Sequence, residues 1–97
     1  MRKYVVRNQF HVGVGEFSTM REAVKFAINI LGGLYNDKQG YPSAQRLIEE
    51  DINKFTDVLT SLGTKFAPKP DKLISGRYAD ILSFDANDKR DIRKLYF

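Results

Sequence analysis

The chain has 97 residues, of which 42% are hydrophobic and 29% charged, with a formal net charge of +4 and no cysteine. These values are typical of one globular domain, and they exclude disulfide frameworks, thiolate nucleophiles and thiolate zinc sites. No apolar run approaches the roughly 18 residues needed to span a bilayer, and the N-terminus lacks an apolar stretch of signal-peptide length. We therefore expect a single domain, residues 1–97, that is cytoplasmic and has no membrane partner.

Positive charge is concentrated at the two ends of the chain. Residues 1–15 contain three basic and no acidic residues, residues 16–62 five basic and seven acidic, and residues 63–97 eight basic and five acidic. If the two ends meet in the fold, they form one basic surface suited to an acidic partner. If they do not meet, the same residues are an ordinary solvated surface.

Residues 3–17 alternate between apolar and polar side chains, which is typical of a half-buried β-strand. The pattern fits either one long strand or a tight hairpin that turns near Asn8 and Gln9. In either case one face is expected to carry Tyr4, Val6, Phe10, Val12 and Val14.

A first helix is predicted to begin after Thr19. Thr19 and Glu22 have the spacing of a capping box, and apolar residues follow at helical spacing from Met20 to Leu31. Gly32 and Gly33 then suggest that the helix ends. Residues 34–42 contain several turn formers and predict a connection.

A second helix is predicted from Ser43, as N-cap, to Gly63, as a left-handed residue after the C-terminus. Its apolar residues recur at alternating steps of four and three, so they share one stripe around which the other elements are expected to pack. They are Ile48, Ile52, Phe55, Leu59 and Leu62. A short connection makes the two helices an antiparallel pair.

The last third of the chain contains extended segments. Pro68 and Pro70 exclude a helix from residues 65–76, and residues 77–84 predict a strand with Tyr78, Leu82 and Phe84 on one face. Residues 85–90 are rich in turn formers, and residues 91–97 fit either a short helix or, by slight preference, a strand. The predicted fold is α+β, in the order β-α-α-β-β: a small antiparallel sheet covered on one face by an antiparallel helix pair.

Two short patterns resemble catalytic or nucleotide sites only superficially. Gly13 and Gly15 form a G-x-G pattern, but the full pattern requires a third glycine or alanine at the start of the helix and then a second parallel strand. This chain continues with two helices and no such strand, so we interpret the glycines as a strand exit or bulge. His11 is the only histidine, which excludes a two-histidine metal site, and we expect it to face solvent or a partner.

The C-terminal aspartates do not form a recognisable metal site either. In the 85–90 segment, Lys89 and Arg90 occupy positions where a calcium loop needs an oxygen ligand and a glycine. Pro70 and Asp71 resemble the start of a nuclease motif, but no Asp-x-Lys or Glu-x-Lys pattern follows them. We therefore predict a non-enzymatic protein with no catalytic residues, no metal and no cofactor.

The first functional hypothesis is a small protein that occupies a surface of a nucleic acid or nucleoprotein and regulates or inhibits it. Its predicted phosphate contacts come from both ends of the chain: Arg2, Lys3, Arg7, Lys69, Lys72, Arg77, Lys89, Arg90, Arg93 and Lys94. Three aromatic residues with polar or cationic neighbours would add stacking faces: Tyr35, Tyr41 and Phe66. The alternative is that Tyr35 and Phe66 only seal the ends of the helix pair.

The alternative hypothesis is a purely protein-binding inhibitor or adaptor, comparable in size with accessory proteins of phages and mobile elements. Such a protein would use an exposed sheet edge or the loop from Tyr35 to Tyr41. A metal-dependent nuclease or other enzyme is the least favoured interpretation. The sequence does not decide between DNA, RNA and protein as the target, nor whether the chain forms a homodimer.

Overall fold

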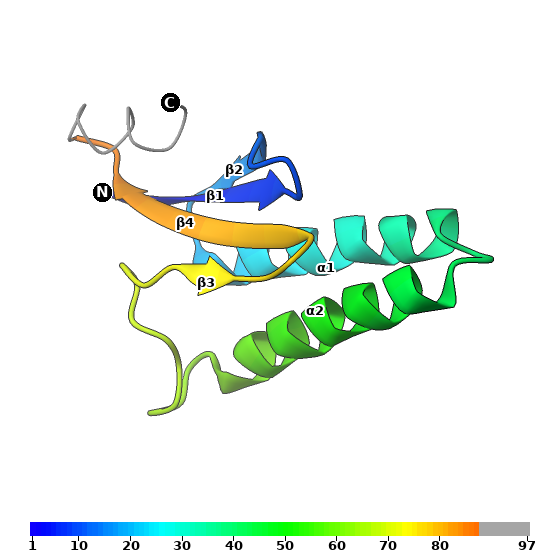
Figure 1. Ribbon diagram of the computed structural model, residues 1–97. Helices are drawn as coiled ribbons and strands as arrows, with labels where there is room; N and C mark the ends of the chain where they lie inside the picture. The colour runs from blue at the N-terminus through cyan, green and yellow to red at the C-terminus, as the bar shows by residue number, and fades with distance from the viewer. Residues whose placement is uncertain (88–97) are drawn as a thin grey trace.

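The computed structural model describes residues 1–87 and confirms the predicted α+β class (Figure 1). Four strands form an antiparallel sheet in the order β2-β1-β4-β3. Two helices pair with each other and cover one face of the sheet. The elements are β1 (Arg2–Asn8), β2 (Gly13–Phe17), α1 (Met20–Asp37), α2 (Pro42–Ser61), β3 (Ile74–Ser75) and β4 (Ala79–Asp85). The predicted strand or helix at 91–97 lies outside the described residues.

The first alternating segment is a hairpin rather than one long strand. The Asn8 side chain closes its turn, because Oδ1 accepts the backbone N–H groups of Phe10 at 2.9 Å and Val12 at 3.2 Å. His11 takes a positive φ of 61° in the same turn. The prediction that Phe10 and Val12 share the buried face was wrong, since both lie in this turn with exposed side chains.

Helix α1 begins as predicted but ends later. The Thr19 hydroxyl accepts the N–H of Glu22 at 3.2 Å, which confirms Thr19 as the N-cap. The same hydroxyl donates to the Glu22 carboxylate at 2.9 Å, so this carboxylate bonds to the hydroxyl and not to the Thr19 backbone N–H as in a full capping box. The helix then continues through Gly32 and Gly33 to Asp37, contrary to prediction. Neither glycine has a positive φ, and the turn after them packs Leu34 and Tyr35 against the core. Burial of these side chains outweighs the low helix propensity of glycine.

Helix α2 confirms the apolar stripe and corrects its start. Ile48 and Phe55 are fully buried, and Ile52, Leu59 and Leu62 pack against the same core. The N-cap is Tyr41, not Ser43, because Pro42 occupies the start of the helix, where its missing N–H costs nothing. Gly63 follows the helix with a φ of 84°, as predicted.

The main core lies between the helix pair and one face of the sheet. Strand β1 contributes Tyr4 and Val6, and β4 contributes Ala79 and Ile81. Leu82 and Phe84 share one face of β4, as predicted, and this face is opposite to that of Ala79 and Ile81. Helix α1 supplies small and branched residues to the same core: Ala23, Val24, Ala27 and Leu31.

A buried carboxylate joins α2 to the turn before β4. Asp51 is 4% exposed and accepts the backbone N–H groups of Arg77 at 3.0 Å and Tyr78 at 2.7 Å. Gly76 permits this approach, because an added Cβ would lie 2.6 Å from the Ala79 carbonyl oxygen and 2.8 Å from the Asp51 carboxylate. Asp51 therefore has a structural role. Within residues 1–87, neither helix is long and apolar enough to cross a membrane.

Candidate functional site

The start of β1 places two predicted basic residues at one end of the sheet. Arg2 lies opposite Asp85 in β4, and its guanidinium donates to the Ser83 hydroxyl at 3.2 Å. Lys3 is the next residue, and its ammonium donates to the Ser18 hydroxyl at 3.0 Å. Both side chains are only partly buried, so their positive charge remains accessible from solvent.

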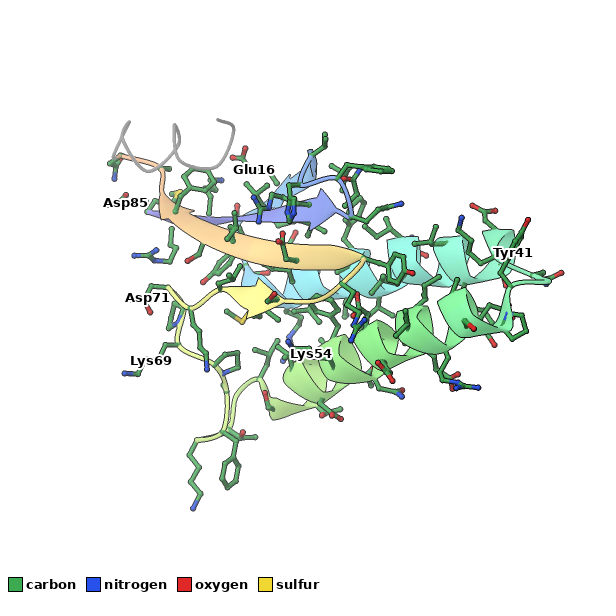
Figure 2. All side chains as sticks on the ribbon, viewed as in Figure 1. Glu16, Tyr41, Lys54, Lys69, Asp71 and Asp85 are labelled. Atoms are coloured by element: carbon green, nitrogen blue, oxygen red, sulfur yellow. The ribbon has the colours of Figure 1, made fainter. Side chains whose placement is uncertain are left out.

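The loop formed by residues 62–73 brings further lysines to this end. Strand β3 pairs with β4 so that Ile74 lies opposite Ile81, which places the residues just before Ile74 alongside the far end of β4. Lys72 and Lys69 therefore lie on the Asp85 side of the sheet, and both are exposed. Figure 2 shows Lys69, Asp71 and Asp85 at the same end of the molecule.

Phe66 protrudes from the first half of this loop. Its side chain is 77% exposed, and the Lys65 ammonium lies 5.2 Å from the centre of its ring. Thr64 orders this turn, because its hydroxyl donates to the Ser61 carbonyl at 2.6 Å and accepts the N–H of Phe66 at 3.2 Å. The alternative interpretation, in which Phe66 only seals an end of the helix pair, is wrong, because the side chain is exposed and is not part of the core.

We use the term basic end for the basic residues of two segments, the start of β1 (Arg2 and Lys3) and the 62–73 loop (Lys65, Lys69 and Lys72). This loop extends from the end of α2 away from the sheet before it returns to β3 (Figure 1). The N-terminal amine adds one more positive charge at the start of β1 and lies 3.4 Å from the Asp85 carboxylate. Asp71 and Asp85 are acidic residues at the same end of the molecule. A hydrogen bond from the Asn87 backbone N–H lowers the pKa of Asp85, and the amine and Arg2 act in the same direction.

The other basic residues predicted to bind do not join this cluster. Arg7 lies towards the opposite end of β1, where Asp80 accepts two hydrogen bonds from its guanidinium and raises its pKa. Arg77 lies in the turn between β3 and β4, also away from the basic end. Lys89, Arg90, Arg93 and Lys94 fall outside the described residues.

The two tyrosines are also separated from the basic end. Tyr35 is half-buried, packs against the core and accepts a hydrogen bond from the Gln45 side chain through its carbonyl oxygen. Tyr41 is 66% exposed in the connection between the helices. Figure 2 shows it at the opposite end of the molecule from Lys69. Tyr41 and Phe66 therefore cannot contact one small target together.

The basic set predicted from the sequence omitted Lys65 and the N-terminal amine. The cation–π contact of Lys65 follows from its position beside Phe66, so the sequence contained that signal. The amine joins the cluster only because β1 pairs with β4, which sequence spacing alone does not reveal.

We also searched residues 1–87 for side chains grouped closely enough to bind a metal ion. Within residues 1–87, no group of three or more histidine, cysteine or acidic side chains lies close enough together to hold a metal ion. The imidazole of His11 is exposed, with Nδ1 at 3.8 Å from the Asp80 carboxylate. That carboxylate is already held by Arg7. The arrangement at the basic end instead combines accessible cations with one accessible aromatic face.

Comparison with other proteins adds no functional information. No protein-family model, curated protein or solved structure matches this chain. The functional argument therefore depends on the geometry of the site.

Proposed function

We propose that the protein binds nucleic acid non-enzymatically through the basic end and regulates its target by occupying that surface. The observation that supports this function best is the 62–73 loop, which presents the 77% exposed Phe66 beside Lys65 and close in sequence to Lys69 and Lys72. Exposed aromatic faces combined with cations are the elements that bind single strands, because bases stack on the ring while phosphates meet the cations.

The preference for a single strand follows from Phe66. In a duplex the bases are already stacked on one another, so their faces are not available to a protruding side chain. Stacking of an unpaired base on an aromatic side chain contributes about 1–3 kcal/mol. Lysines supply point charges without a fixed geometry, so the contacts position the phosphates and carry no base specificity.

The experiment is a salt titration of binding to fluorescently labelled single-stranded DNA and RNA, measured by anisotropy. Log affinity should fall linearly with log salt, by about 0.7 for each phosphate contact. The triple variant Lys65→Ala, Lys69→Ala, Lys72→Ala should therefore reduce the slope by about 2. Phe66→Ala should weaken binding at every salt concentration with little change in slope.

The structure provides a control with the same change in net charge. Lys38, Arg46 and Arg77 lie towards the other end of the molecule, so replacing all three by alanine should leave most of the salt slope intact. Equal losses in the two triple variants would show that only net charge matters. Absence of salt-dependent binding by the wild-type protein at low ionic strength would reject the proposal.

A further inference from the structure

A second surface lies between the β1–β2 hairpin and the second half of α1, and we call it the hairpin groove. It encloses about 350 Å³, within the usual range for pockets that accept a small ligand or a buried side chain. Apolar side chains make up most of its wall. The described lining residues are Asn8, Gln9, Val14, Ile30, Leu31, Gly33, Leu34, Asp37 and Tyr78.

A β-bulge explains why Val14 contributes to this wall. Val6 of β1 lies opposite Gly15, whereas the next residue, Arg7, lies opposite Gly13. Val14 is thus the extra residue of β2, and a bulge of this kind changes the direction of side chains on the bulged strand. Val14 faces the groove together with Ile30 and Leu31 of α1.

Gly33 leaves the floor of the groove without a side chain. Glycine inside a helix costs about 0.5–1 kcal/mol relative to alanine, yet the fold does not require it here. Its φ is not positive, and an added Cβ would meet nothing within 4 Å. Gly32 has the same properties but does not line the hairpin groove. Gly33 therefore adds no side chain to the wall of the groove beside Leu34 and Asp37.

The charge of the groove restricts what can enter it. Asp37 is the one charged residue among the described lining residues, and within residues 1–87 its carboxylate makes no ion pair or hydrogen bond. Asp37 also ends α1, whose last turn contains no basic residue. The carboxylate and the helix dipole both favour a cation at this position.

The rim of the groove is apolar beyond Val14. Phe10 is 75% exposed and Val12 is 54% exposed in the hairpin turn. Both belong to the same hairpin as Val14, and exposed apolar side chains of this kind are common where proteins bind each other. The bulge disrupts the outer edge of β2, which opposes simple addition of a partner strand there. The groove itself has the volume to accept an inserted side chain.

We propose that the hairpin groove binds a peptide segment of a partner protein, with one bulky apolar side chain in the groove and a neighbouring lysine or arginine paired with Asp37. This site is separate from the basic end, because Asn8 and Arg2 are the opposite ends of β1. The proposal therefore allows a nucleic acid and a protein to be bound at the same time. A negative result for peptide binding would leave the nucleic-acid proposal unchanged, and the reverse also holds.

The first test is selection from a display library of short random peptides on the immobilised wild-type protein. Enriched peptides should share a leucine, isoleucine, methionine or aromatic anchor beside a basic residue. Their synthetic versions should shift the amide NMR signals of Val14, Leu34 and Asp37. Failure to enrich any peptide, a consensus without the basic residue, or shifts confined to residues 62–73 would overturn the proposal.

The second test uses two matched variants. Gly33→Gln fills the groove, whereas Gly32→Gln places the same helix-forming residue at the neighbouring position outside it. Both should raise the thermal midpoint, because glutamine favours the helix. Only Gly33→Gln should weaken peptide binding, by about tenfold or more, as loss of a central contact does. Equal binding by the two variants would contradict the assignment.

A charge reversal tests the role of Asp37 directly. Asp37→Lys should weaken binding of the selected peptide, and a peptide with glutamate in place of its basic residue should bind Asp37→Lys better than it binds the wild type. Asp57→Lys, at an exposed position on α2, controls for the change in net charge. If the glutamate peptide binds Asp37→Lys no better than it binds the wild type, the proposed ion pair is wrong.

Discussion

Arg7 of β1 and Asp80 of β4 lie opposite each other and form a bidentate ion pair. Nε of Arg7 donates to Oδ1 at 2.8 Å, and its Nη2 donates to Oδ2 at 2.6 Å. The side chains are 17% and 9% exposed. Planar guanidinium and carboxylate groups matched in this way fix geometry as well as charge. The pair therefore fixes the pairing of the two central strands, and Arg7 is not available to a phosphate.

Breaking this pair from one side should destabilise the protein more than replacing both partners. Asp80→Leu leaves a largely buried guanidinium without its acceptor and should cost about 1.5–3 kcal/mol. The double variant Arg7→Met, Asp80→Leu removes both charges and should recover most of that loss. Urea unfolding of the wild type and the three variants, including Arg7→Met, gives the coupling energy. Additive losses would mean that the pair contributes no specific stability.

Asp51 should be required for the turn before β4. Asp51→Ala leaves the N–H groups of Arg77 and Tyr78 without their acceptor and should cost about 1–3 kcal/mol. Asp51→Asn keeps one acceptor oxygen and should lose less. Chemical denaturation gives both values, and faster hydrogen exchange at these two amides would locate the effect. Unchanged exchange in Asp51→Ala would show that the turn is held by other contacts.

Phe55 tests the central role of α2. Its side chain is completely buried in the core between helices and sheet, so Phe55→Ala should cost about 3–5 kcal/mol. That loss is a large part of the whole stability of a small domain. Circular dichroism and urea unfolding should show a largely unfolded chain or a much lower midpoint. Phe66→Ala, which removes an exposed ring, should change the midpoint little.

The Asp85 carboxylate should contribute stability only above acidic pH. Its pKa is lowered in the folded protein, first by the Asn87 N–H and then by the N-terminal amine and Arg2, with desolvation acting in the opposite direction. Because the pKa is lower in the folded state, the ionised carboxylate stabilises the fold fully at pH values above the ordinary aspartate pKa of about 3.9. This contribution is lost as the pH falls through the folded-state pKa. The stability difference between wild type and Asp85→Asn should therefore shrink on acidification.

An NMR titration of the Asp85 side-chain carbon measures the folded-state pKa directly. A midpoint below the ordinary value is expected, and acetylation of the N-terminal amine should raise it slightly, because the amine is a secondary cause. A midpoint at or above the ordinary value would contradict the hydrogen bond from Asn87.

The features that sequence patterns predicted correctly depend on local interactions. The N-cap bond between Thr19 and Glu22 spans only four residues, and the stripe containing Ile48 and Phe55 is set by helical period alone. The end of α1 was predicted too early because Gly32 and Gly33 have low helix propensity. Packing of Leu34 against the core outweighs that propensity, so the helix continues past both glycines. Turn chemistry near Asn8 permitted a hairpin, but without a glycine it did not require one.

The site could be predicted only in part because it depends on strand order. Arg2 and Lys72 come together through the pairing of β1 and β3 with β4. Arg7 carries the same charge and lies only five residues after Arg2, but its partner is 73 residues away in the sequence. The hairpin groove had no signal in the sequence, because it depends on the bulge at Val14 and on continuation of α1 past Gly33.

The position of β4 between β1 and β3 has a consequence for synthesis of the chain. The first and last strands of the described residues are the two central strands of the sheet, so their pairing closes a loop that contains both helices. Such distant pairing slows folding, because the entropy of closure is lost before the contacts form. During translation the helix pair can form early, but the sheet must wait until Asp85 has left the ribosome. Until then, one side of β1 remains unpaired and open to association with other chains.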